Sequence, residues 1–139
     1  MQSTALSIAL AAAAILVGGV LWLNAPQESS SDIVSRTGLH WHPQLLIYVK
    51  DEAVEIPHNI GLGAVHSPMH THEDLPIIHL EFNGIVRTDD TRLGNFFRIW
   101  GKDMSSFGPN LRMTVNGQES TEYENYAMRD GDKIELRYE

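Results

Sequence analysis

The first 23 residues carry no charged side chain, and this segment limits what the rest of the chain can form. Ala5 to Leu23 is apolar apart from one serine and two glycines, close to the length that a helix needs to cross a bilayer. Apolar residues lie on every side of such a helix, which argues against a buried helix of a soluble core. We therefore expect a transmembrane anchor or uncleaved signal over residues 1–24.

The segment lacks the features of a cleaved signal peptide. It contains no Lys or Arg, and Leu23-Asn24-Ala25 before Pro26 matches a small-residue cleavage site poorly. A retained single-pass anchor is favoured, held in the membrane by residues 5–23, and secretion is the alternative if the segment is removed. Residues 25–36 are expected to be a linker, and residues 37–139 one domain on the outer side of the cell membrane.

Charge and cysteine content narrow the chemistry of this domain. The chain has 10 basic and 18 acidic residues, with a formal net charge of −8 and no basic patch, which argues against a nucleic-acid partner. It has no cysteine, so the domain depends on packing rather than on disulfides. Any metal site must then use nitrogen, oxygen or thioether ligands.

Hydrophobic periodicity predicts an α+β domain. Residues 39–50 and 75–82 alternate as strands, with Pro43 at an edge or bulge. Thr91 to Trp100 has the apolar spacing of one amphipathic helix, capped by Asp90 or Thr91 and ended by Gly101. Turn signals at 116–117 and 130–131 predict a final meander. We expect a mixed sheet of about five or six strands with the helix on one face.

All seven histidines fall between His40 and His79, which is too crowded for scattered surface residues. His40 and His42 are two residues apart, so on a strand their side chains point to one face, about 6.5–7 Å apart. His70 and His72 repeat this spacing, and His79 lies on the strand that follows. Two such pairs on neighbouring strands with a fifth imidazole exceed the three or four ligands that a zinc or copper ion needs.

The sequence therefore predicts a copper or zinc site. The candidate ligands are His40, His42, His66, Met69, His70, His72, His79 and Glu81. Met69 would favour copper if its thioether points inward, and Glu73, Asp74 and Glu81 can orient imidazole N–H groups or bind directly. The expected role is metal binding, delivery or sensing, in contact with an envelope protein.

Two other functions stay open at this stage. Crowded imidazoles can form a metal-free, pH-responsive or structural hydrogen-bond network in an interaction module. Three histidines with an open coordination position are also the arrangement of a small zinc hydrolase or hydratase. Since no residue spacing identifies a nucleophile triad or a substrate pocket, a binding protein is favoured over an enzyme.

Several motifs in a fixed order resemble a family of small exported or membrane-tethered bacterial and archaeal proteins. The matching stretches are LHWHPQLLIYV, IPHNIGLG, HTHEDLPIIHLE, LGNFFRIWG, TVNG and YAMRDGDKIEL, between His40 and Leu136. The resemblance carries over the positions His40, His42, His70, His72, His79 and Glu81, and it implies no settled activity. Many members of that family have a cysteine in the stretch that corresponds to residues 65–69 of this chain, and a glycine where this chain has Leu75-Pro76. The C-terminal half is similar to ubiquitin-like β-grasp folds.

Overall fold

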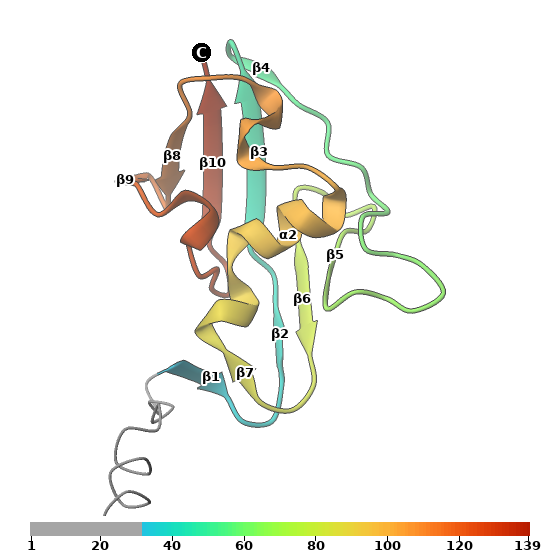
Figure 1. Ribbon diagram of the computed structural model, residues 1–139. Helices are drawn as coiled ribbons and strands as arrows, with labels where there is room; N and C mark the ends of the chain where they lie inside the picture. Colours follow the sequence, from blue (N-terminus) through green and yellow to red (C-terminus); the bar gives the residue numbers. More distant parts are fainter. Residues whose placement is uncertain (1–31) are drawn as a thin grey trace, which may run out of the picture. The chain divides into compact units, whose positions relative to one another are not determined.

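Short strands make up most of the regular structure in residues 32–139, the part of the chain that the computed structural model describes (Figure 1). The strands are β1 (Ile33–Ser35), β2 (Leu39–Trp41), β3 (Gln44–Val49), β4 (Glu52–Ala53), β5 (Met69–His70), β6 (His79–Phe82), β7 (Val86–Arg87), β8 (Arg112–Val115), β9 (Gln118–Ser120) and β10 (Lys133–Tyr138). The helices are α2 (Leu93–Trp100) and the 3₁₀ turns η2 (Thr88–Thr91), η3 (Met104–Phe107) and η4 (Tyr123–Asn125). The anchor expected over residues 1–24 lies outside the described range. Within that range, no helix has the length and apolar character of a membrane span.

The largest sheet has five strands in the order β4-β3-β10-β8-β9. Its central strand, β10, is parallel to its neighbour β3, and the other pairs are antiparallel. Parallel neighbours need a long crossover, and α2 lies within the chain that joins them. The predicted α+β class, with one α-helix and a mixed sheet of five strands, is confirmed for the described residues.

Two smaller sheets complete the domain, with β1 paired to β7 and with β6 between β2 and β5. The single strand predicted over residues 39–50 is wrong in this respect, because the chain leaves one sheet and joins another at His42-Pro43. Pro43 has no N–H for a strand ladder, and its carbonyl accepts a hydrogen bond from the N–H of Ile78 at 2.8 Å. Regular structure also begins at Ile33, inside the segment expected to be linker.

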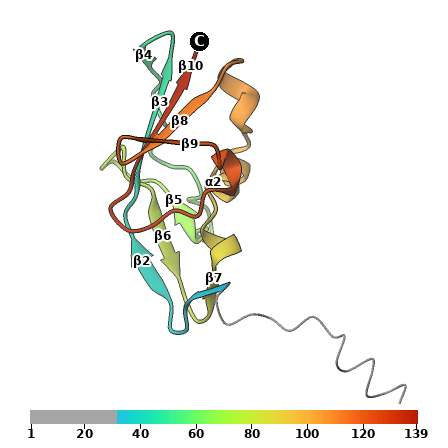
Figure 2. The ribbon, with the colours of Figure 1, turned by 90° about the vertical axis from the view of Figure 1, so that its left-hand side faces the viewer.

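Helix α2 covers the core side of the sheets (Figure 2). Its Leu93, Phe96 and Phe97 are buried, as the periodicity predicts. The helix begins two residues later than expected, with Arg92 as N-cap, because η2 occupies the preceding residues. It ends at Gly101, which has φ 74°, a left-handed conformation that glycine adopts without a Cβ clash.

The C-terminal hairpins are tied together by the buried carboxylate of Asp132. It accepts hydrogen bonds from the Tyr126 hydroxyl at 2.7 Å, the Arg129 N–H at 2.8 Å and the Asn116 side-chain amide at 2.9 Å. Burial, and then the bond to Asp132, raise the pKa of the Tyr126 hydroxyl above its ordinary value. Asn116 begins the predicted Asn-Gly turn, and its positive φ and that of Gly117 are typical of a tight hairpin.

We expect Asp132→Ala to lower the free energy of unfolding by about 2–4 kcal/mol, because three donors lose a charged acceptor inside the fold. Urea unfolding followed by circular dichroism measures the change. The exposed Glu55→Ala variant is the matched control and should fall within about 0.5 kcal/mol of wild type. An Asp132→Ala protein as stable as the control would contradict this role.

Candidate metal centre

Strand β6 builds the site by alternation, since successive side chains on a strand point to opposite faces. Leu80 is fully buried and belongs to the hydrophobic core. His79 and Glu81, on either side of it, therefore point to the other face. Because β6 is the middle strand of its sheet, both of its neighbours can add side chains to that face.

Strand β5 adds His70, which is in register with His79, while Met69 is in register with Leu80. The imidazole of His70 thus joins the face of His79, and the thioether of Met69 points into the core. The burial of Met69 agrees with this assignment, because the residue is 1% exposed and packs in the core cluster. The structure therefore does not bring Met69 to the histidines.

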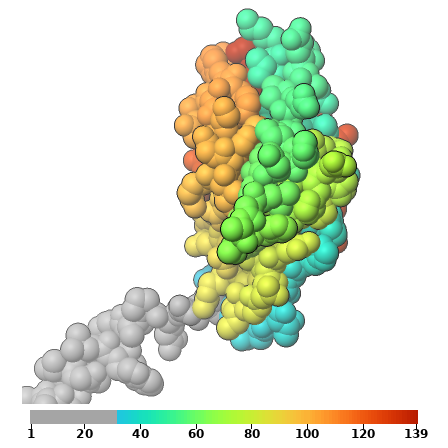
Figure 3. Space-filling model, turned by 90° about the vertical axis from the view of Figure 1, so that its right-hand side faces the viewer, coloured from blue at the N-terminus to red at the C-terminus, as the bar shows by residue number. Residues whose placement is uncertain are grey.

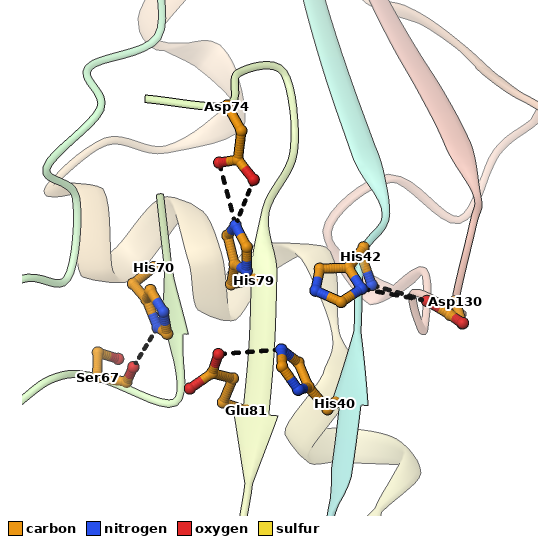
Figure 4. A network of polar contacts seen from close by, with 8 residues as sticks. All are labelled: His40, His42, Ser67, His70, Asp74, His79, Glu81 and Asp130. Carbon is orange, nitrogen blue, oxygen red and sulfur yellow. Dashed lines mark hydrogen bonds and ion pairs between the residues drawn. The ribbon is translucent and has the colours of Figure 1, made fainter. Parts of the chain in front are cut away.

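Strand β2 adds His40 from the opposite side, in register with Glu81. His42 follows the strand directly and stands beside His79, with ring centroids 5.0 Å apart. Figure 4 shows His40 and His42 on one side of β6 and His70 on the other, with His79 and Glu81 between them. The expected convergence of histidines from separate β-segments is observed.

His79 is the centre of this group, which we call the histidine face: His40, His42, His70, His72, His79 and Glu81. The ring of His79 lies 4.9 Å from His72, 5.0 Å from His42 and 5.5 Å from His70, measured between centroids. His66 lies further out, 5.8 Å from His70 and exposed to solvent. Of the predicted ligands, His66 therefore stands at the rim.

Oxygen partners indicate which ring nitrogen carries the hydrogen in three of the imidazoles, those of His70, His79 and His40. The Nδ1 of His70 lies 2.9 Å from the carbonyl oxygen of Ser67, and a carbonyl only accepts, so Nδ1 carries the hydrogen and Nε2 keeps its lone pair. The Nε2 of His79 lies 3.1 Å from both carboxylate oxygens of Asp74, which leaves Nδ1 with the lone pair. These are the oxygen partners that orient histidine ligands in metal sites.

His40 repeats this chemistry at the exposed edge, whereas His42 is held there through its backbone. The Nε2 of His40 lies 3.0 Å from a Glu81 oxygen, so the Nδ1 of His40 keeps its lone pair. The backbone N–H of His42 donates to the Asp130 carboxylate at 2.8 Å, and this anchors the residue that joins β2 to β3. Asp130 is far away in the sequence, and neither it nor Ser67 was identified from local spacing.

Two overlapping sets of side chains have ligand atoms close enough to share an ion. One set is His40, His42 and His79, and the other is His70, His79 and Glu81. Within each set the ligand atoms all lie within 4.8 Å of one another. Nitrogens around a tetrahedral zinc ion with bonds of 2.0–2.1 Å are about 3.3 Å apart, so small side-chain rotations would close either set around a metal.

Protein-family models, curated proteins and solved structures all give no match to the chain. The family resemblance drawn from the sequence stays a prediction.

A groove of about 550 Å³ runs along the histidine face. Its lining includes His40, Glu81 and His70, together with His66 at the rim. The loop of residues 54–68, drawn in green, forms much of the adjoining surface in Figure 3. An ion or a small ligand can therefore reach members of both sets from solvent.

Burial lowers the pKa of the His70 imidazole, because the charged form loses hydration. The Ser67 carbonyl and Glu81 raise it, and His72 and His79 lower it further. The hydrogen bond from His79 lowers the pKa of Asp74, so this carboxyl stays ionised as an acceptor. In the metal-free protein, His70 is thus held neutral with its Nε2 able to bind a cation.

A folded-state pKa below the unfolded value of about 6.5 means that the unfolded chain binds the proton more tightly. The contribution of the neutral His70 side chain to the free energy of unfolding is fully present above about pH 6.5. It is lost as the pH falls from about 6.5 toward the lowered pKa of His70 in the folded protein. We expect the metal-free protein to lose unfolding free energy between pH 7.5 and 5.5, and His70→Gln to lose less. Urea unfolding in the presence of a chelator at both pH values tests this. Equal losses in the two proteins would show that His70 does not contribute.

Proposed function

We propose that this domain binds a divalent transition metal ion, copper or zinc, through the histidine face with His79 as the central ligand. The observation that carries the proposal is the presence of two ligand sets, each within 4.8 Å, that share His79. Imidazole and carboxylate groups without a thiolate suit Zn²⁺ and Cu²⁺. The net charge of −8 also favours the approach of cations.

The exposure of the ligands supports a role in which the ion is exchanged. Structural zinc sites are closed, with four protein ligands around the metal. Here His40 and Glu81 are exposed and open onto the groove, and His42 is partly exposed. An ion bound by these residues stays accessible to water and to the donor atoms of a partner. This supports metal delivery or sensing over a purely structural role.

We place this activity at the outer face of the cell membrane, with an envelope protein as the partner that supplies or receives the ion. The support is the uncharged apolar segment of residues 5–23, which has the length of a single-pass anchor. The acidic composition of the chain supports a protein or metal partner over nucleic acid.

We also propose a β-grasp-like relationship for the five-stranded sheet. The order β4-β3-β10-β8-β9, with the central strand β10 parallel to β3 and with α2 in the connection between these two strands, supports that likeness. Fold similarity alone would not assign a function, so the metal proposal stands on the site and not on the fold.

The second candidate is a metal-free, pH-responsive interaction module. The observation in its favour is that His70 is held neutral by burial while several imidazoles already have oxygen partners. Acidification would then charge the face and disrupt it. The third candidate, a zinc hydrolase or hydratase, has only the open groove in its favour.

Metal titration of the full chain tests the proposal. The protein is purified in detergent and carries no histidine tag. Calorimetry with Zn²⁺ and Cu²⁺ at pH 7.5 should give near-stoichiometric uptake, which weakens as the pH falls below about 6.5 because protons compete for the imidazoles. His79→Ala should weaken binding by about 100-fold or more, because both sets lose a ligand.

The matched control is His58→Ala, which removes an exposed imidazole outside both ligand sets. It should bind like wild type. Thermal unfolding with chelator present shows whether each variant is folded. Absence of uptake by the wild-type chain, with acid-induced changes in the same domain, would favour the pH-responsive module instead.

A further inference from the structure

The two ligand sets share His79 on β6. One set adds His40 and His42 from the side of β2, and the other adds His70 from β5 and Glu81 from β6 itself. We call His40, His42 and His79 the outer set, and His70, His79 and Glu81 the inner set. Among the residues that the structure describes, no set within the same distance limit contains both His42 and His70. An ion therefore meets one set or the other, and not all five side chains at once.

His79 has one nitrogen to offer to a metal. Its Nε2 is held by both oxygens of Asp74 at 3.1 Å, which fixes the hydrogen on that atom. Binding two ions at once would need an imidazolate bridge, and the ring would have to lose this proton and both contacts to Asp74. The lone pair on Nδ1 serves a single ion.

Ring orientation separates the two sets. An imidazole binds a metal along its lone pair, which lies in the plane of the ring, so an ion shared by two rings must lie in both planes. The rings of His42 and His79 are perpendicular, at 90°, and their planes intersect. The rings of His70 and His79 are stacked at 10°, so one of them must rotate before both can bind the same ion. The outer set is closer to a binding geometry.

Exposure separates the imidazoles of the two sets as well. The side chains of His40 and His42 are 61% and 42% exposed, whereas His70 is 2% exposed, and the carboxylate side chain of Glu81 is 48% exposed. Ions from solvent thus meet the imidazoles of the outer set before that of His70. The groove is lined by His40 from the outer set and by His70 and Glu81 from the inner set, so the two positions open onto the same space.

We propose that the domain holds one ion that moves between two positions around His79, a favoured outer position with His40 and His42 and a weaker inner position with His70 and Glu81. This inference rests on the proposed metal-binding function. In the movement, the bonds to His40 and His42 break and bonds to His70 and Glu81 form, while the bond to His79 persists. Glu81 accepts a hydrogen bond from His40 when the ion is in the outer position, and becomes a ligand in the inner one.

Three variants of the full chain, each with Cu²⁺, test this inference by ion stoichiometry, affinity and electron paramagnetic resonance. Wild type should bind one ion. His70→Ala should also bind one, within about tenfold of wild-type affinity and with a similar spectrum, because the outer set is intact. His42→Ala should bind one ion about 10–100-fold more weakly, with a spectrum that reports fewer nitrogen and more oxygen ligands.

The double variant His42→Ala/His70→Ala should bind at least another tenfold more weakly than His42→Ala, because neither set is then complete. His58→Ala serves again as the matched control, and circular dichroism with chelator checks folding. Two ions per wild-type chain, or a His42→Ala protein as weak as the double variant, would overturn the two-position inference and leave the metal-binding proposal standing. A His42→Ala protein that binds Cu²⁺ with the affinity and spectrum of wild type would also overturn the two-position inference. Absence of any uptake would overturn both.

Discussion

The pairing of β6 with β2 on one side and β5 on the other is the constraint on which the domain depends. Leu80 points into the core from this strand, and its neighbours His79 and Glu81 point to the other face. A shift of one residue in either register would exchange the two faces and move imidazoles into the core. Core packing therefore enforces the position of the histidines, and no separate scaffold is needed to hold them.

Crowded imidazoles would repel one another if they carried charge. In this structure, oxygen atoms accept hydrogen bonds from the rings and hold them in fixed orientations. Ser67 and Asp74 each fix one ring hydrogen, and burial keeps His70 neutral. Neutral rings with assigned hydrogens present lone pairs in set directions. The hydrogen bonds that make the metal-free face stable are thus the same ones that prepare it for a cation. The metal-binding and pH-responsive interpretations differ in which cation, a metal ion or a proton, binds the free lone pairs, and not in the architecture.

Local pattern was sufficient where a local rule decides the structure. The two-residue spacing brought the rings of each His-x-His pair together, at 4.6 Å for His40 and His42 and 4.9 Å for His70 and His72, although the second histidine of each pair lies just after its strand. Gly101 and the Asn116 turn marked the ends of elements correctly. The same alternation puts Met69 opposite His70, so its burial follows from strand periodicity. Contacts between distant segments were not accessible in this way. The bond between His42 and Asp130 spans 88 residues, and β1 is too short to show a period.

The burial of Met69 also bears on which ion the histidine face suits. Without a thioether or a thiolate, its donors are imidazole nitrogens and carboxylate oxygens. Cu⁺ is a soft ion that prefers sulfur, whereas Zn²⁺ and Cu²⁺ accept nitrogen and oxygen, and Cu²⁺ binds such sites more tightly than Zn²⁺. The donors of the histidine face therefore match the divalent ions better than Cu⁺. Rotation of a few side chains, with no movement of the fold, would bring these donors around either divalent ion.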